Sequence, residues 1–396
     1  MNRRGPIAVL TKLRSSAVLR YTPEALDRGL GIPVLSVSLP TVNRALRGTS
    51  VHAFFNGLLP EGDARRMIAH DFGIDPGDTF ALLATLGRDC AGALVILPDG
   101  HDLPAEATPT LISDAEIADR IRNLRFSPLG VDQDLRVSLA GMQEKLLLAR
   151  GAKGWALPRD GVPSTHIVKP RHRLLGGTIA NEAICMRVAR HLGIPVATIE
   201  ITSFDGVEAL VIERFDRRRD GDRVERVHQE DLCQAHGLEP ERKYEAAGGP
   251  SLRRCARTIS DWSPTRRSIE QLRDLTTLNV LLGNADAHAK NVGLLHGPEG
   301  SIALAPAYDL MSTTFYPAVS TRAAMHVNGT ADIDQITVAD LIAEAASWGL
   351  RRAHTSERIH ELIEAAPAAV TAAADEIAAP DGLIEHLMAR ARRLAL

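Results

Sequence analysis

The sequence reads LLGNADAHAKN at residues 281–291 and APAYDL at residues 305–310. Asp286 stands five residues before Asn291, and a second carboxylate, Asp309, follows eighteen residues after Asn291. Because Asn and Asp favour turns, a simple turn is one interpretation of the first stretch. Its polar residues crowd between two apolar elements, however, and this flanking pattern favours a functional site.

The step of five residues from Asp286 to Asn291 is that of the protein-kinase catalytic loop, H-R-D-x-x-x-x-N. Kinase-type phosphoryl transfer uses one Asp to accept a hydroxyl proton, and an Asn and a second Asp to hold Mg²⁺ on the nucleotide phosphates. The spacing therefore predicts an ATP-dependent kinase. Asp286 is the expected catalytic base, and Asn291 and Asp309 are the expected ligands of Mg²⁺, which takes few protein oxygens besides the phosphates.

Two further polar residues of this loop each have two possible roles. Lys290 either contacts the γ-phosphate of ATP or has a structural or surface role. His288 is a second candidate for the ATP site, with the same alternative.

Lys169 lies in THIVKP at residues 165–170. Kinases place the lysine that contacts the α- and β-phosphates at the end of a buried apolar strand. A solvated lysine at a strand end is the alternative, and the downstream Asp286 loop favours the functional interpretation. Glu182, near the start of the next helix, is a candidate ion-pair partner of Lys169, or else a first-turn acid that interacts with the helix dipole.

The stretch VSLAGMQEK at residues 137–145 is similar to a phosphate-covering loop. Its small residues let backbone N–H groups approach phosphates, which makes Ser138, Ala140 and Gly141 candidates for ATP binding. It lacks the G-x-G-x-x-G pattern, so an ordinary hairpin remains the alternative. The stretch VIERFD at residues 211–216 joins the expected lobes, either as a hinge that offers backbone groups to adenine or as an ordinary strand end.

Composition narrows the class of protein. The chain has 396 residues, 45% apolar content and 24% charged content, as in an ordinary soluble protein of two or three packed units. The net charge of −3 gives no general reason to expect nucleic-acid binding. Three clusters concentrate positive charge and are either solvated surface or contacts to phosphate or a partner: Arg214 with Arg217–Arg219, Arg253 with Arg254 and Arg257, and Arg390 with Arg392 and Arg393.

Cysteine usage and apolar runs bear on the compartment. None of the four cysteines pairs at C-x-x-C spacing, which argues against a zinc site, and scattered thiols favour a reducing compartment. Residues 1–12 carry basic residues without an apolar signal-peptide core. No apolar run reaches the ~18 residues of a membrane span. A cytoplasmic protein is the expectation.

Three parts are expected along the chain, and together they predict an α+β, two-lobed, protein-kinase-like fold. Residues 1–110 form an α/β subdomain, with strands at 34–39 and 93–97 and a helix end followed by a turn at 54–62. Its boundary is a loop that opens at Pro98 and runs past Pro104 and Pro109.

Residues 111–216 read as an ATP-binding part with strands at 145–149, 165–169 and 207–215 and one helix at 181–192, stopped by Gly193 and Pro195. Residues 217–396 read as a helical C-lobe that carries the catalytic loop. Ser268 fits a capping box at the start of a helix that Gly283 ends.

Motifs along nearly the whole length give the chain a resemblance to the HipA family, the kinase toxins of bacterial toxin–antitoxin modules. The stretches that carry it are GLLPEG (57–62), LGRD (86–89), SLAGMQEK (138–145), HIVKP (166–170), ERFDR (213–217), HQED (228–231), GGP (248–250), the Asp286 loop and YDL (308–310). Their order and spacing together are highly specific.

The resemblance implies roles for particular residues. It makes Asp286 the base, Asn291 and Asp309 the Mg²⁺ ligands and Lys169 a phosphate ligand, and it places the backbone of Glu213 and Phe215 against adenine. Ser138 is similar to the family's inhibitory autophosphorylation serine. A phosphate there adds about −1.5 to −2 charge, which would repel the ATP phosphates and could eject the loop.

The resemblance also implies substrates and partners. Family substrates include aminoacyl-tRNA synthetases, whose phosphorylation on a serine near the ATP site blocks translation and leads to growth arrest and persistence. The usual partner is HipB, a small helix-turn-helix antitoxin that bridges the toxin to operator DNA. Two alternatives stay open: a small-molecule phosphotransferase, and a catalytically silent co-repressor that acts through an antitoxin.

Overall fold

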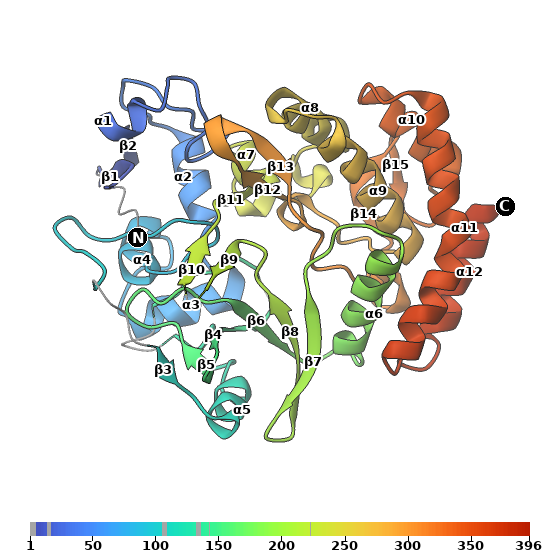
Figure 1. Ribbon diagram of the computed structural model, residues 1–396, viewed down its shortest axis with the longest axis horizontal. Coiled ribbons are helices and arrows are strands. Elements are labelled where there is room, and N and C mark those ends of the chain that lie inside the picture. Colours follow the sequence, from blue (N-terminus) through green and yellow to red (C-terminus); the bar gives the residue numbers. More distant parts are fainter. Residues whose placement is uncertain (1–4, 14–16, 105–108, 132–135, 142, 222) are drawn as a thin grey trace.

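The computed structural model describes residues 5–13, 17–104, 109–131, 136–141, 143–221 and 223–396. Figure 1 shows the mostly helical N-terminal part on the left, the strands of the middle part at the lower centre, and the long C-terminal helices α10, α11 and α12 on the right. Helices and sheets both occur, and the expected α+β, two-lobed arrangement is present.

The N-terminal part begins with an antiparallel hairpin and continues in helices. Its elements are β1 (Ala8–Lys12), β2 (Ala17–Tyr21), α1 (Pro23–Leu26), α2 (Thr49–Asn56), α3 (Gly62–Asp71) and α4 (Thr79–Leu86). The expected helix end and turn at 54–62 is confirmed, because α2 ends at Asn56 and α3 begins at Gly62.

Both strands predicted in this part are wrong. Residues 34–39 form a turn with one isolated bridge, Ser36 to Leu39. The Ser36 and Ser38 hydroxyls donate to Glu230 Oε2 at 2.5 Å and to the Gln234 carbonyl at 2.7 Å, so side chains tie this segment to a distant loop instead of a ladder. Residues 93–97 belong to no ladder either, and Ile96 N–H donates to the Gly87 carbonyl at the end of α4.

The middle part is built on a six-stranded antiparallel sheet with the strand order β3-β5-β4-β6-β8-β7. The strands are β3 (Thr110–Leu111), β4 (Leu146–Gly151), β5 (Gly154–Leu157), β6 (His166–Pro170), β7 (Ile199–Phe204) and β8 (Val207–Glu213), and the helices are α5 (Asp114–Arg122) and α6 (Thr178–His191). The three expected strands are confirmed with shifted ends, and the expected helix starts earlier, at Thr178.

A second helix in the middle part was not predicted. α5 begins with a capping box in which the Ser113 hydroxyl accepts from Glu116 N–H and the Glu116 carboxylate accepts from Ser113 N–H. The sequence SDAE at residues 113–116 carries this signal. The predicted boundary between the first two parts falls inside β3, and the division into three domains stays a prediction.

The C-terminal part combines short strands with long helices. Its strands are β9 (Arg217–Asp220), β10 (Arg223–Arg226), β11 (Gln229–Asp231), β12 (Gly293–His296), β13 (Ile302–Leu304), β14 (Arg322–Val327) and β15 (Thr330–Asp332). Its α-helices are α7 (Leu232–Ala235), α8 (Leu252–Trp262), α9 (Arg267–Leu282), α10 (Val338–Ser347), α11 (Arg352–Glu376) and α12 (Leu383–Ala395). Among its described residues, five 3₁₀ turns occur between them: η1 (Pro240–Arg242), η2 (Glu245–Ala247), η3 (Ala289–Asn291), η4 (Pro298–Gly300) and η5 (Thr313–Phe315).

The expected capping box at Ser268 is wrong. α9 begins at Arg267, so Ser268 lies inside its first turn, and the buried Ser268 hydroxyl accepts from Leu304 N–H at 3.2 Å instead of capping the helix. The expected end is confirmed, because Gly283 adopts a left-handed conformation with φ of 69° at the C-cap.

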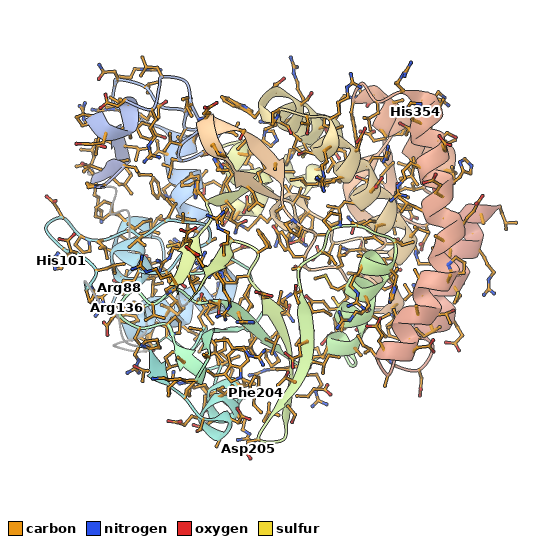
Figure 2. The ribbon with its side chains drawn as sticks, viewed as in Figure 1. Arg88, His101, Arg136, Phe204, Asp205 and His354 are labelled. Atoms are coloured by element: carbon orange, nitrogen blue, oxygen red, sulfur yellow. The ribbon has the colours of Figure 1, made fainter. Side chains whose placement is uncertain are left out.

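The sheet separates two hydrophobic cores. Along β8, Ala209 and Val211 face a core shared with the N-terminal helices, whereas Leu210 and Ile212 face a core shared with α6 and the C-terminal helices. This alternation is the period of two of a strand buried on both faces. Figure 2 labels Phe204 and Asp205 at the outer tip of the β7–β8 hairpin, so the opposite end of β8, at Glu213, is the end that leads into the C-terminal part.

The four cysteines are buried free thiols. Of the helices that the structure describes, none is long and apolar enough to cross a membrane.

Candidate active site

The catalytic loop is fixed at both ends by regular structure. It leaves α9 at Gly283 and enters β12 after η3, and β12 pairs with β13 in a hairpin. Because the hairpin returns the chain, Asp309, after β13, comes back toward Asn291, before β12. The guanidinium of Arg390 on α12 donates to the Val280 carbonyl at 2.8 Å and so caps the end of α9.

Asp286 keeps solvent access and carries two kinds of contact. The hydroxyl of Tyr244 donates to its Oδ1 at 2.7 Å. The amide of Asn291 donates to its backbone carbonyl at 3.1 Å, which ties the expected base to an expected Mg²⁺ ligand. Loss of water around the carboxyl raises the pKa of Asp286, and the hydrogen bond from Tyr244 opposes that rise.

Lys169 at the end of β6 lies between two carboxylates. Its Nζ is 2.7 Å from Glu182 Oε1 on α6 and 2.5 Å from Asp309 Oδ1. The Lys169–Glu182 pair is therefore confirmed. Burial alone would raise the pKa of Asp309, but the ammonium of Lys169 outweighs it and lowers the pKa to about 2, so Asp309 is ionised at neutral pH.

The donors at Asn291 and Asp309 suit Mg²⁺. Asp309 offers a carboxylate whose side chain is 41% exposed, and Asn291 uses its amide N–H₂ toward Asp286, which leaves its oxygen as a donor. Mg²⁺ is typically bound through one or two carboxylates together with substrate phosphates and water. The residues present fit such an ion.

Lys290 and His288 are both buried. The Lys290 ammonium donates to Asp231 Oδ2 at 2.8 Å and lies 3.7 Å from Glu61 Oε1, which favours its structural interpretation. The Nδ1 atom of His288 is buried and has no hydrogen-bond partner among the described residues. Burial lowers the pKa of His288 to about 3, so the imidazole is neutral.

The expected phosphate loop lies against the N-terminal part. Ser138 is fully buried, and its hydroxyl donates to the Leu58 carbonyl at 2.7 Å. The Ala140 carbonyl accepts from Lys145 Nζ at 2.8 Å. Gly141 has a φ of 116°, a conformation that residues with a side chain rarely adopt, so the loop favours glycine at this position. Met142 lies outside the described residues.

The alternative hairpin is not formed by the described residues of this stretch. Ser138 N–H donates to the Asp89 carbonyl at 3.0 Å, and β4, which follows at Leu146, pairs with β5 and β6. The loop therefore packs on α2 and α4 through their following turns and not on itself.

The expected hinge leads out of β8. Glu213 is exposed, and the ring of Phe215 lies 5.4 Å from that of Tyr308, inclined by 31°. Between them, Arg214 points into the protein and donates to Asp216 Oδ2 at 2.7 Å. Arg214, Arg217 and Arg390 are thus buried and paired, which corrects the solvated interpretation for these members of the basic clusters.

A cleft of about 720 Å³ opens beside the phosphate loop. Its lining includes Gly141 and Lys145 of this loop, Pro60 and Arg66 of the N-terminal part, and Arg171 and Arg173 after β6. The cleft therefore adjoins the expected phosphate loop, and its lining mixes cationic side chains with the carboxylates of Asp63, Asp71 and Glu144.

Three residues of the site were not singled out from the sequence. Burial, followed by repulsion from Lys169, lowers the pKa of the buried Lys145 to about 8. Tyr244 contacts Asp286, and Glu61 reaches the site from the N-terminal part, 3.7 Å from both Lys243 and Lys290. Lys145 and Glu61 lie within the quoted motifs, whereas Tyr244 gave no signal, because nothing in its spacing links it to the catalytic loop.

Comparison with known proteins adds the family. Residues 2–97 match the HipA N-terminal domain, and residues 137–370 match the HipA-like C-terminal domain. The second match covers more than half of the chain. The chain belongs to the HipA family.

Relatives agree with this assignment. A putative kinase of Sinorhizobium fredii, Y4mE, is 38% identical over 88% of this chain and 85% of its own length. The serine/threonine-protein kinase toxin HipA of Shewanella oneidensis is 35% identical over 79% of this chain and 75% of its own length. A solved complex of Shewanella oneidensis HipA, HipB and operator DNA matches with a TM-score of 0.84 and 28% identity, covering 98% of this chain and 95% of that one. The HipA fold expected from the motifs is therefore confirmed.

Proposed function

We propose that this chain is a serine/threonine-protein kinase toxin of a HipBA-like module that transfers the γ-phosphate of ATP to a serine of a protein. The observation that carries the proposal is the bridge from Glu182 through Lys169 to Asp309, at 2.7 and 2.5 Å, beside the Asp286–Asn291 loop. Kinases require this lysine–glutamate pair and the metal-binding aspartate to be in place together.

Each residue then has a role in the transfer. Asp286 accepts the proton as the acceptor hydroxyl forms its bond to the γ-phosphorus and the bond to the β-phosphate oxygen breaks, leaving ADP. Lys169 orients the α- and β-phosphates, and the backbone of Ser138, Ala140 and Gly141 covers them. Asn291 and Asp309 would hold Mg²⁺, and the bound ion would supply positive charge that neutralises the phosphates. Lys290 supports the loop by its bond to Asp231, and the neutral His288 lines the site.

Adenine is assigned to the backbone of Glu213 and Phe215. The support is positional: the two residues follow β8 directly, and β8 neighbours β6, which carries Lys169. The Phe215 and Tyr308 rings, 5.4 Å apart, give this end of the site an apolar surface.

Ser138 is proposed as the autophosphorylation site. Its hydroxyl is buried against Leu58, and no phosphate fits there without displacement of the loop. Phosphorylation would add about −1.5 to −2 charge and favour the displaced loop. Ser138→Ala should remove a mass shift of one phosphate from protein incubated with Mg-ATP, and persistence of that shift would place the modification elsewhere.

The proposed partners follow from the relatives. The Shewanella oneidensis HipA was solved with HipB and operator DNA, which supports a HipB-like helix-turn-helix antitoxin and indirect contact with DNA for this chain. An aminoacyl-tRNA synthetase is the proposed substrate, with inhibition of translation, growth arrest and persistence as the outcome in the cytoplasm.

One experiment separates this proposal from its alternatives. Purified protein is incubated with Mg-ATP and a panel of aminoacyl-tRNA synthetases, and phosphate incorporation is mapped by mass spectrometry. We expect phosphate on a serine of one synthetase. Transfer only to a metabolite would favour a small-molecule phosphotransferase. No transfer at all, with antitoxin-dependent DNA binding intact, would favour a silent co-repressor.

A further inference from the structure

The loop between α7 and α8 reaches across to the catalytic loop. It contains η1 and η2 and places Tyr244 beside Asp286, where the phenol hydroxyl donates to Oδ1 at 2.7 Å. The position is notable because an acceptor hydroxyl must make the same kind of bond to the same carboxylate. Tyr244 is therefore either a temporary occupant of the acceptor position or a fixed support for the base.

The backbone around Tyr244 is held in place. Its carbonyl accepts from both Ala247 N–H and Gly249 N–H at 2.9 Å. A Cβ on Gly249 would lie 2.7 Å from the same carbonyl oxygen, so the turn closes too tightly for a side chain there. The preceding carbonyl, of Lys243, accepts from Ala289 N–H at 3.1 Å, which joins this loop directly to η3 of the catalytic loop.

Side chains on both sides hold the loop as well. The Tyr244 ring packs edge-on against the His288 ring, at 5.3 Å between centroids and 84° between planes. Glu245 Oε2 accepts from His326 N–H at 2.7 Å, and Lys243 Nζ lies 3.7 Å from Glu61 Oε2. A residue anchored in this way does not leave readily to make room for a substrate, so the fixed support is the better explanation.

The two carboxylate oxygens of Asp286 differ in their hydrogen bonding. Oδ1 is taken by Tyr244, whereas none of the described residues donates to Oδ2. Asp286 also keeps solvent access. One oxygen is thus held, and the other is left without a donor from the described residues.

We propose that Tyr244 is a positioning residue for the transfer reaction: its hydroxyl holds Oδ1 of Asp286 so that Oδ2 faces the acceptor hydroxyl. This inference rests on the proposed kinase function. It assigns the loop at residues 240–250 to the acceptor side of the site, opposite the phosphate loop, and it links the N-terminal part to the base through Glu61 and Lys243.

The test compares Tyr244→Phe with wild type. The variant keeps the ring and its packing on His288 but loses the hydroxyl. Tyr21→Phe is the matched control, since it removes a buried hydroxyl that donates to the Leu39 carbonyl in the N-terminal part. The rate of phosphate transfer from radiolabelled ATP into protein, the KM for ATP and the thermal unfolding midpoint are measured for all three proteins.

A positioning role predicts a change in turnover without a change in nucleotide binding. We expect kcat of Tyr244→Phe to fall about tenfold, which is less than the full contribution of a well-placed base. The KM for ATP and the unfolding midpoint should be as in wild type. Tyr21→Phe should keep wild-type kcat. An unchanged kcat in Tyr244→Phe, or a raised one, would overturn the inference; a raised one would make Tyr244 a competitor of the acceptor.

A second measurement does not depend on turnover. A crystal structure of Tyr244→Phe with Mg²⁺ and a non-hydrolysable ATP analogue should show the Asp286 carboxylate rotated from its wild-type orientation. The same orientation in both proteins would overturn the inference. If wild type transfers no phosphate, the proposed function fails on that result alone, while this structure still decides the role of Tyr244.

Discussion

Two networks of charged side chains, one at the hinge and one beside the expected catalytic loop, differ in how completely their members are paired and buried. The hinge network, Asp89, Ser164, Arg214, Asp216 and Arg217, is sealed: each side chain is buried and hydrogen-bonded. The catalytic network, Lys169, Glu182 and Asp309, is open on one side, because the Asp309 side chain is 41% exposed while that of Asp89 is 1% exposed.

Two unsatisfied buried atoms lie near the expected catalytic loop. Glu61 Oε1 and His288 Nδ1, both near the catalytic loop, are buried without a hydrogen-bond partner among the described residues. Buried polar groups in native proteins are nearly always paired, so orphaned groups mark places where a ligand or water is expected. The sealed network therefore supports the fold, and the open one is where we propose that nucleotide, metal and acceptor bind.

The largest expected effect is loss of the base. Asp286→Asn should reduce phosphate transfer by about 10²–10⁴-fold, because the amide cannot accept the acceptor's proton. The unfolding midpoint should stay at the wild-type value, since Asp286 is exposed to solvent. The exposed Asp261→Asn on α8 is the matched control. Near-normal turnover of Asp286→Asn would reject Asp286 as the base.

Breaking the sealed network should act on stability instead. Asp89→Asn leaves Arg217 and Arg214 with less compensation in a buried site, and loss of one partner of a buried pair typically costs about 3–5 kcal/mol. Denaturant unfolding measures this difference. Glu225→Gln, which breaks an exposed pair with Arg218, should leave the free energy of unfolding unchanged. Equal effects of the two substitutions would remove the distinction between the networks.

The stability that the Asp89 carboxylate contributes should depend on pH in a definite direction. Burial would raise the pKa of Asp89, but Arg217 and Arg214 outweigh burial and lower it. The stability that this carboxylate contributes is then complete above its unfolded pKa of about 3.9 and is lost as pH falls further, through the folded value. The difference in the free energy of unfolding between wild type and Asp89→Asn should become smaller below about pH 4. A difference that stays constant with pH would show that the ionised Asp89 carboxylate is not its cause.

The smallest expected effect concerns Lys145, with its pKa of about 8. Only the protonated form attracts phosphates, so ATP should bind more weakly at pH 9 than at pH 7, by at most about tenfold. Calorimetric titration at both pH values measures this. Lys145→Met should remove most of the dependence, and a dependence that survives in this variant would assign it to another group.

The sequence predicted what local patterns encode. Asp286, Asn291 and Asp309 are positioned by the end of one helix and by the hairpin that follows it. The Lys169–Glu182 pair joins one strand to the next helix along the chain. The residues concerned lie close together in the sequence or belong to recurring sequence motifs.

The failures have a shared physical cause. Residues 34–39 alternate like a strand, but Ser36 and Ser38 bond to Glu230 and Gln234, nearly two hundred residues away. Ser268 matched a helix cap but bonds to the backbone of Leu304. Tyr244 reaches Asp286 from 42 residues upstream, on a loop between the short 3₁₀ turns η1 and η2. Tertiary contacts decided each of these, and no periodicity in the sequence records them.

The most direct test of the central claim is a crystal structure of the protein with Mg²⁺ and a non-hydrolysable ATP analogue. The account predicts oxygens of Asn291 and Asp309 at about 2.0–2.1 Å from the ion, Lys169 on the α- and β-phosphates, and Asp286 free of the metal and facing the γ-phosphate. Nucleotide bound elsewhere, or Asn291 and Asp309 apart with no metal between them, would contradict it.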